Sequence, residues 1–311
     1  KDYILLWFLM KYNIILHTTT ACNYNCSYCD VVKDGKMLSQ DIRERVIEFG
    51  MRNKNHIDTF KFFWWEPLLA YKEIQYLCDR LPFRENYQIV TNTTLLNQSI
   101  WVYFRDTFKI IFFSIDTEHI FDFEGVTTYI TQFELSEKIY FNLIISPGSE
   151  RESLRDFMHL YDLWHRGFNI LPVYFTKPWS QENLGNLSII MKVILDLAHK
   201  DPTVKLYGFQ ENEWYDTSLV NHSLFIDIDG EVYYSDMVST FSGKTFKEAL
   251  YIWNIATLNL DDISQERIQK QKKIISDLEK SLYSKSQWQL QLHKMMDYFS
   301  VYLNRINDQS V

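Results

Sequence analysis

The chain has 311 residues with a formal net charge of −8, and 46% of its residues are hydrophobic and 16% aromatic. This composition excludes a disordered chain, and the length allows one large domain with an appendage or two domains. The acidic balance argues against a protein that binds nucleic acid through a broad basic surface.

The chain opens with an apolar run, YILLWFLM, at residues 3–10, and Lys11 follows it. A membrane-spanning helix needs about 20 apolar residues, and a signal peptide has a basic start and a small-residue cleavage site. The run meets neither requirement, so we expect a buried first strand or helix. We expect a cytoplasmic protein that does not bind a membrane.

Strand-like and helical patterns alternate over the first two thirds of the chain. We predict strands over residues 14–20, 58–65, 87–92, 109–115, 138–145 and 169–175, and helices over 39–52, 71–80, 97–105, 126–135, 151–166 and 184–199. This alternation predicts a parallel sheet. Six strand–helix units are fewer than the eight that close a full barrel, so the sequence predicts an α/β fold with a partial (β/α)6 TIM-like barrel.

The pattern changes after residue 205. The segment SLFIDIDGEVYYSDM, residues 223–237, predicts a β-hairpin that turns at Asp229 and Gly230. Apolar residues at spacings of three and four then predict a helical extension. These are Ile275, Leu278, Leu282, Leu292, Met295, Met296, Phe299 and Leu303. We therefore predict a barrel domain over residues 1–205 and a C-terminal domain, made of the hairpin and the helices, over residues 206–311.

Three of the four cysteines lie in one short segment, ACNYNCSYC at residues 21–29. Cys22, Cys26 and Cys29 follow the first predicted strand, at the carboxyl end of the barrel, where such folds build their active sites. Structural zinc normally takes four ligands, and the fourth cysteine, Cys78, lies in a predicted helix as a core residue. Three thiolates can instead hold a [4Fe–4S] cluster with one open iron. The pattern favours the cluster, and zinc remains the alternative.

The cysteine segment and the segments that follow it resemble the radical S-adenosylmethionine (SAM) family. FKFFWWEPLL resembles that family's Gly-Gly-Glu-Pro segment, IVTNTTLL its Thr-Asn-Gly segment and FFSIDT its Ser-Ile-Asp-Gly segment, while FNLIIS matches its fifth strand. IDIDGEVYYSD resembles the C-terminal hairpin of the peptide-modifying branch that carries SPASM or twitch domains. The resemblance covers roughly residues 12 to 240, in matching order.

This resemblance implies an enzyme in which Cys22, Cys26 and Cys29 hold one [4Fe–4S] cluster. An electron from the reduced cluster would cleave SAM to a 5′-deoxyadenosyl radical, and the radical would abstract a hydrogen from a substrate, which we expect to be a peptide or a small molecule. A reductase, flavodoxin or ferredoxin would supply the electron. The SAM site is expected to involve Tyr28, Trp64, Trp65, Glu66, Asn92, Ser114, Asp116 and Asn142.

Those residues have specific expected roles. Ser114 and Asp116 would contact the ribose hydroxyls or the methionine moiety, Asn142 a neighbouring polar group, and Tyr28 the adenine. Ser, Asp and Asn at strand ends also commonly cap the helix that follows, which is the structural alternative for these positions.

The sequence departs from the family pattern at two places. Trp64 and Trp65 replace the two glycines, and Thr93 replaces a third. Because adjacent strand residues point to opposite faces, we expect one indole to face the barrel interior or SAM and the other to face the helices. Ser235 stands where the hairpin has a cysteine, and no cysteine follows Cys78, so no cysteine-ligated auxiliary cluster can form in the C-terminal half.

Two hypotheses of other classes stay open. One is a cluster-bearing scaffold or binding protein that does not cleave SAM, and the Trp64–Trp65 pair motivates it. The other is a zinc-stabilised binding module.

Overall fold

The structure is a computed structural model that describes residues 11–29, 31–173, 177–207, 223–234, 250–260 and 263, and in the C-terminal region residues 270, 273, 274, 277, 291, 292, 294–296 and 299. The chain divides into two compact units. The first comprises residues 1–25, 31–111 and 219–276, and the second residues 26–30, 112–218 and 277–311.

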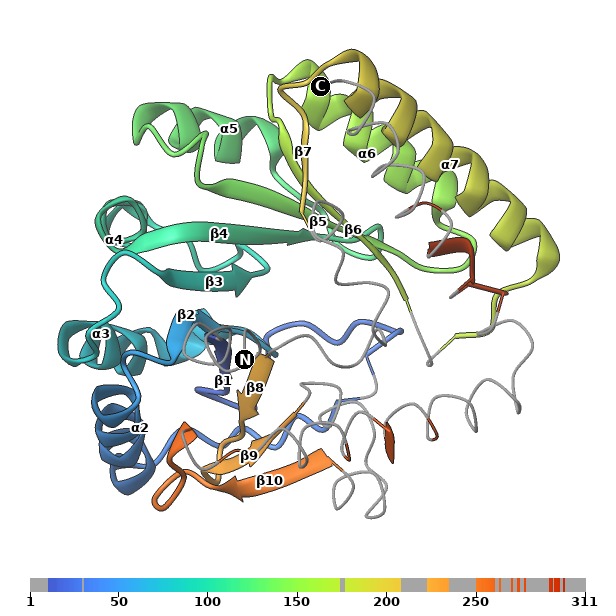
Figure 1. The fold of residues 1–311 in the computed structure, drawn as a ribbon. Coiled ribbons are helices and arrows are strands. Elements are labelled where there is room, and N and C mark those ends of the chain that lie inside the picture. The colour runs from blue at the N-terminus through green and yellow to red at the C-terminus, as the bar shows by residue number, and fades with distance from the viewer. Residues whose placement is uncertain are drawn as a thin grey trace, which may run out of the picture. The chain divides into compact units, whose positions relative to one another are not determined.

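The first unit is built on strands in the order β10-β9-β8-β1-β2-β3 (Figure 1). These strands are β1 (Tyr12–Leu16), β2 (Ile57–Phe62), β3 (Tyr87–Thr91), β8 (Ser223–Ile226), β9 (Glu231–Tyr233) and β10 (Tyr251–Asn254). Strand β1 pairs in parallel with both β2 and β8, and β2 pairs in parallel with β3. Strand β9 pairs antiparallel with β8 and β10.

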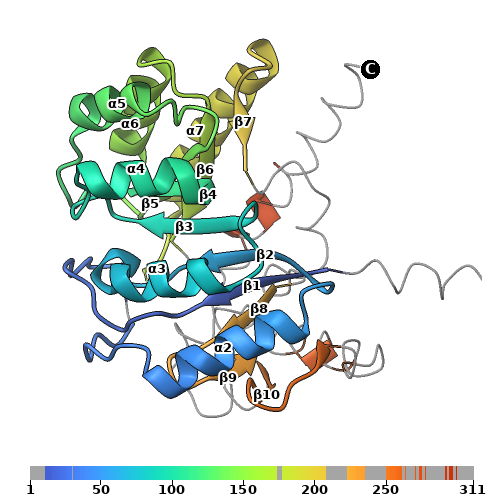
Figure 2. The same ribbon diagram turned by 90° about the vertical axis from the view of Figure 1, so that its left-hand side faces the viewer.

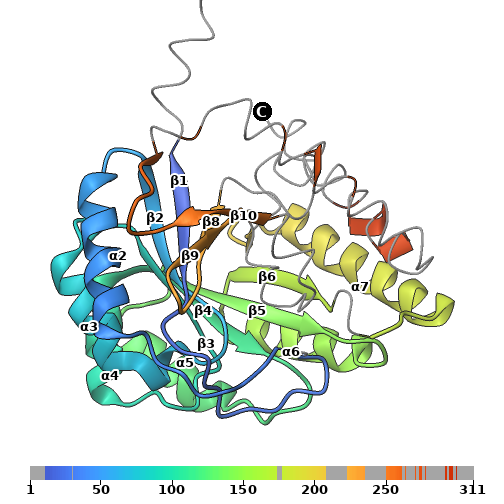
Figure 3. The same ribbon diagram turned by 90° about the horizontal axis from the view of Figure 1, so that it is seen from below.

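Helices cover one side of these strands, as Figures 2 and 3 show. They are α2 (Gln40–Arg52), the short 3-10 helix η1 (Pro67–Ala70), α3 (Tyr71–Arg80) and α4 (Gln98–Thr107). The side chains of Ser39 and Asn97 accept backbone N–H bonds at the starts of α2 and α4, which explains where these helices begin. Aromatic rings from the strands, including Phe60, Phe62 and Tyr87, are fully buried in the core.

The second unit repeats the strand–helix alternation. It contains α5 (Phe123–Gln132), β5 (Ile139–Ile145), α6 (Glu150–Asp162), β6 (Gly167–Pro172), α7 (Gln181–Lys200) and β7 (Lys205–Leu206). Strands β5, β6 and β7 pair in parallel, and α5, α6 and α7 lie along one side of them (Figure 1). Strand β4 (Phe108–Ile115) contributes its first half to the first unit and its second half to the second.

The parallel α/β fold and the open barrel are confirmed. Among the described residues, β10 and β7 are the edge strands, so the sheet is not closed. The hairpin is also confirmed, because β8 and β9 join through a turn in which Gly230 has a φ of 81°. A Cβ there would lie 3.0 Å from Ile42 Cδ1, a tight contact that the Ile42 side chain would have to relieve, so the positive φ is the main reason for glycine at this turn.

Two predicted strands end earlier than expected. The first ends at Leu16 rather than residue 20, because the backbone of Thr18 and Thr20 turns to pair with residues 36–38. The second ends at Phe62 rather than residue 65, because Trp64 and Trp65 adopt positive φ angles. The expectation that these indoles alternate along a strand was therefore wrong.

Several expectations concern residues outside the described part of the chain. They are the apolar run 3–10, Ser235, and all but a few positions of the helical extension. The few described positions of the extension are helical, and Leu292, Met296 and Phe299 among them are buried. A domain boundary near residue 205 stays a prediction. No helix in the described residues has the length and apolar character needed to cross a membrane.

Candidate functional site

The cysteine segment directly follows β1 and spans the two units, with Cys22 in the first and Cys26 and Cys29 in the second. All three are partly exposed, and none of the four cysteines forms a disulfide. Cys78 lies on α3 and is buried, and burial raises the pKa of its thiol to about 12. A thiol that stays protonated makes a poor metal ligand, which agrees with the expectation that Cys78 is a core residue.

Glu66 connects the carboxyl ends of β2 and β3. Its carboxylate is fully buried and accepts hydrogen bonds from the Leu68 N–H at 3.0 Å, the Thr91 hydroxyl at 2.8 Å and the Asn92 N–H at 2.7 Å. Burial raises the pKa of this carboxyl to about 7, although the three hydrogen bonds act in the opposite direction. Glu66 thus fixes the turn after β2 against the end of β3.

The first part of the cysteine segment is fastened to the same two strand ends. The Asn92 amide donates to Asn23 Oδ1 at 2.8 Å, and the Asn23 amide donates to the Thr94 hydroxyl at 2.6 Å. The Glu66 N–H donates to the Ala21 carbonyl at 3.2 Å. The structure therefore brings Glu66 and Asn92 together. Asn23 was not predicted from the sequence, and its one signal was its place next to Cys22.

Three residues that replace family glycines keep a backbone conformation that favours glycine. Trp64, Trp65 and Thr93 have φ angles of 72°, 51° and 69°. Such conformations cost roughly 1–3 kcal/mol for a residue with a Cβ. The side chains at these three positions therefore stand on a backbone conformation that glycine adopts without strain.

The two indoles lie in an aromatic layer at the ends of β1 and β2. The Trp65 ring stacks on His17 at a centroid distance of 3.7 Å, and its indole N–H donates to the Val32 carbonyl at 3.0 Å. Burial lowers the pKa of His17 to about 3, so its imidazole is neutral at pH 7. Within the described structure, His17 Nε2 and Trp64 Nε1 are buried atoms that have no hydrogen-bond partner.

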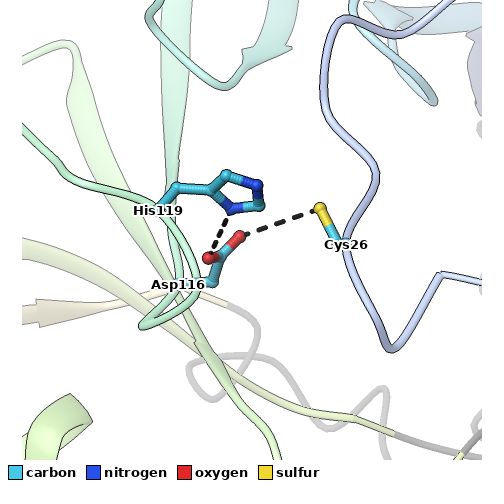
Figure 4. A group of neighbouring side chains, drawn as sticks. All are labelled: Cys26, Asp116 and His119. Carbon is cyan, nitrogen blue, oxygen red and sulfur yellow. Dashed lines mark hydrogen bonds and ion pairs between the residues drawn. The ribbon is translucent and has the colours of Figure 1, made fainter.

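In the second unit, Asp116 lies at the carboxyl end of β4 and binds part of the cysteine segment (Figure 4). It accepts from the Tyr28 hydroxyl at 2.7 Å and from the Glu118 N–H at 2.9 Å, and its Oδ1 lies 2.7 Å from His119 Nδ1. Its Oδ2 lies 4.0 Å from Cys26 Sγ. Burial, and then the Asp116 charge, raise the pKa of Tyr28. The structure thus brings Tyr28 and Asp116 together.

A charged group lies beside this cluster. The Ser27 N–H donates to Glu118 Oε2 at 2.6 Å, and Lys177 Nζ lies 3.3 Å from Glu118 Oε1. The Ser27 hydroxyl also donates to Glu118 and accepts from Lys177. Burial raises the pKa of Glu118, but these hydrogen bonds and the Lys177 charge together lower it. Glu118, His119 and Lys177 were not predicted from the sequence, in which only the polar TEH after Asp116 gave a signal.

The last two predicted residues lie on neighbouring strand elements of the second unit. Ser114 is partly exposed on β4, two residues before Asp116, which follows the end of the strand. Asn142 is buried on β5 and accepts from the Asn169 amide of β6 at 3.0 Å. Their contact with SAM stays a prediction.

No family model and no curated protein match this chain. Among solved structures, it is similar to anSMEcpe with bound AdoMet, with a TM-score of 0.64 and 13% identity over 85% of this chain and 84% of that one. It is also similar to Streptococcus suis SuiB bound to S-adenosylmethionine, with a TM-score of 0.59 and 13% identity over 82% of this chain and 65% of SuiB. Both are radical SAM enzymes. The predicted fold is therefore confirmed, and the chain has the fold of the radical SAM enzymes.

Proposed function

We propose that this chain is a radical SAM enzyme that binds one [4Fe–4S] cluster through Cys22, Cys26 and Cys29. It uses the cluster to cleave SAM reductively and to abstract a hydrogen from a peptide. The observation that carries the proposal is the position of the cysteine segment, which follows β1 directly in a fold shared with enzymes solved with AdoMet.

The donor set fits such a cluster. The three thiols are partly exposed and not in disulfides, and thiolates are the usual ligands of iron–sulfur clusters. When bound, the cluster would supply the electron that splits SAM into methionine and the 5′-deoxyadenosyl radical. The residues around the cysteine segment would then hold that segment in position. Glu66 and Asn92 fix its first part, and Asp116 fixes Tyr28 in its second part.

We assign the adenosyl contacts to the second unit. The Tyr28 ring would contact adenine, and its hydroxyl bond to Asp116 restricts the ring to one orientation. Ser114 and Asp116 would contact the ribose, and Asn142 a polar group beside it. A fixed ring loses less conformational entropy on binding than a mobile one.

We assign the methionyl contacts to the first unit. An indole face can stabilise the sulfonium cation by up to about 2 kcal/mol when the pair is desolvated. The Trp64 indole N–H and His17 Nε2 are buried without partners in the described structure, so a polar ligand would satisfy both. Trp64 and Trp65 would then replace contacts that the family makes through backbone.

A peptide is the substrate class that we favour. anSMEcpe has been solved with the Cp18Cys peptide, and SuiB with its precursor peptide SuiA. A reductase, flavodoxin or ferredoxin would reduce the cluster. Because no cysteine follows Cys78, the electron would reach a single cluster without a cysteine-ligated auxiliary centre.

The cysteines provide the first test. Replacing Cys22, Cys26 or Cys29 with Ala should abolish the cluster after anaerobic reconstitution, because each supplies one ligand. The wild type and the matched control Cys78→Ala should bind about four irons and four sulfides per chain. Loss of the cluster in Cys78→Ala, or wild-type protein that binds no iron, would contradict the assignment.

The tryptophans provide the second test, because a specific observation favours an alternative function. Two indoles where the family has glycine could fill the methionyl pocket, which would make the chain a scaffold that holds a cluster but does not cleave SAM. In the double variant Trp64→Gly and Trp65→Gly we expect SAM affinity and 5′-deoxyadenosine formation to fall at least tenfold while the cluster stays intact.

The control is Trp164→Gly, since Trp164 also has a positive φ, of 67°, but is 82% exposed. It should leave both quantities unchanged. A gain of SAM affinity and cleavage in the double variant would instead support the scaffold.

A further inference from the structure

Three side chains in the second unit form a cluster of metal-binding atoms that the proposed enzyme does not use as a group. Cys26, Asp116 and His119 each offer one ligand atom, and these atoms lie within 4.8 Å of one another (Figure 4). Cys26 comes from the cysteine segment, and the other two come from the end of β4 and the turn after it. We propose that these three residues form a mononuclear zinc site that competes with the iron–sulfur cluster for Cys26.

The chemistry of the donors supports zinc. A thiolate, a carboxylate and an imidazole are all zinc ligands, and three protein ligands with a water in the fourth position make an open tetrahedral site. All three side chains are partly exposed, so an ion and its water can reach them. Thiolate ligation disfavours magnesium and calcium, which prefer oxygen.

The distances are close to those that zinc needs. Tetrahedral zinc places its nitrogen, oxygen and sulfur ligands roughly 3.3 to 3.6 Å apart. Asp116 Oδ1 and His119 Nδ1 are 2.7 Å apart, and Asp116 Oδ2 and Cys26 Sγ are 4.0 Å apart. The ligand atoms of Cys26 and His119 lie within 4.8 Å of each other, so an ion would enter after side-chain shifts on the order of 1 Å.

The surroundings hold the carboxylate in place without neutralising it. The Tyr28 hydroxyl and the Glu118 N–H both donate to Asp116, and such outer contacts orient ligands in metal sites. The nearby Lys177 ammonium is already paired with Glu118. A divalent cation would relieve the repulsion between the Asp116 carboxylate and a Cys26 thiolate.

Binding would involve no redox step. The zinc–sulfur bond forms as the Cys26 S–H bond breaks, and that proton leaves to solvent. With a proton on Nε2 only, the His119 ring would offer Nδ1 to the ion. Zinc binding needs only these three residues, whereas the competition for Cys26 rests on the proposed function.

The test uses full-length, metal-free protein titrated anaerobically with Zn²⁺ and, for its thiolate-to-metal absorption, with Co²⁺. We expect about one ion per chain in the wild type. His119→Gln should weaken binding at least tenfold and reduce the thiolate-to-cobalt band, and Cys26→Ala should abolish that band. Cys22→Ala and Cys29→Ala should keep the band, and zinc-loaded wild type should take up less iron.

A matched control distinguishes zinc binding at this site from zinc binding by a histidine elsewhere on the chain. His159 lies 3.7 Å from Glu124, and no cysteine lies on α6, so His159→Gln should bind zinc as the wild type does. Circular dichroism verifies that each variant is folded, and Asp116→Asn should repeat the loss seen with His119→Gln.

Some results would overturn the inference. They are a wild type that binds no zinc, a His119→Gln variant that binds it normally, or a site that needs Cys22 and Cys29. His119→Gln should still assemble the iron–sulfur cluster. Wild-type protein that binds zinc but never iron would refute the proposed function and the competition for Cys26, and would leave the zinc site itself standing.

Discussion

The two parts of the cysteine segment are held in different ways. The first part is fastened through the exposed Asn23 to residues after β3, and through the Ala21 carbonyl to the backbone of Glu66, whose own side chain is fully buried and hydrogen-bonded. The second part is fastened through Ser27 and Tyr28 to carboxylates after β4, and Glu118 there is ion-paired and exposed. Buried hydrogen-bonded groups are costly to disrupt, whereas exposed ion pairs contribute little and are screened by salt.

The two regions should therefore differ in what they contribute, one to the stability of the fold and the other to ligand binding. The first region should carry the free energy that holds the strand ends together. The second region presents partly exposed thiol, carboxylate and imidazole groups that can exchange ligands. Three substitutions would test this contrast.

The largest effect is expected for Glu66→Gln in the first region. Both oxygens of the carboxyl group can accept hydrogen bonds even when it is protonated, but the amide nitrogen cannot, so the Asn92 N–H or one of the other two donors loses its buried acceptor. Loss of such a bond costs about 1–3 kcal/mol. Urea unfolding should show this decrease in the free energy of unfolding at pH 5, where the carboxyl is protonated in the folded state.

The pH dependence of this variant sharpens the test. The pKa of Glu66 is about 7 in the folded protein against an ordinary value of 4.5, so the folded state binds more protons between these values. The contribution of Glu66 to stability is therefore complete below pH 4.5 and declines as pH rises towards 7, by roughly 3 kcal/mol. Glu66→Gln should lack this decline. Parallel stability curves for wild type and variant would contradict it.

An intermediate effect is expected for Thr93→Gly. Thr93 has a β-branched side chain at a φ of 69°, a conformation that glycine adopts without strain. Relief of strain should exceed the entropy that glycine adds to the unfolded chain, for a net gain of about 0.5–1 kcal/mol. Thr94→Gly, where φ is not positive, should be destabilising. A loss of stability in Thr93→Gly would show that the conformation is not strained.

The smallest effect is expected for Glu118→Gln in the second region. Its ion pair with Lys177 is partly exposed, so the free energy of unfolding should fall by less than about 1 kcal/mol. The decrease should shrink further in 1 M salt, where charges are screened within about 3 Å. A decrease in the free energy of unfolding as large as that of Glu66→Gln would show that the two regions do not differ in this way.

The alternation of strands and helices could be predicted from the sequence because apolar periodicity is a local signal. The early end of β2 could not, because every residue of FKFFWW except Lys61 has strong strand propensity. The strand ends because Trp64 and Trp65 have positive φ angles. Residue propensities predict glycine, and not tryptophan, at positions with such angles.

The site was predictable only as separate motifs. Cys22, Glu66, Asn92 and Asp116 each stand in a recognisable segment, but the partners of their side chains depend on which strand ends become neighbours. His119 is an example, since it follows Asp116 by three residues and only the turn after β4 brings its ring against the carboxylate. Lys177, further along the chain, had no local signal at all.

The burial of Cys78 has a practical consequence for thiol labelling. Thiolates attack alkylating reagents, and a thiol whose pKa is about 12 reacts very slowly near pH 8. Iodoacetamide added to the folded protein should therefore modify the cysteine segment and leave Cys78 intact until the chain unfolds. Mass spectrometry of the labelled protein would then report occupancy at the segment and global unfolding from the same sample, as two separate mass increments.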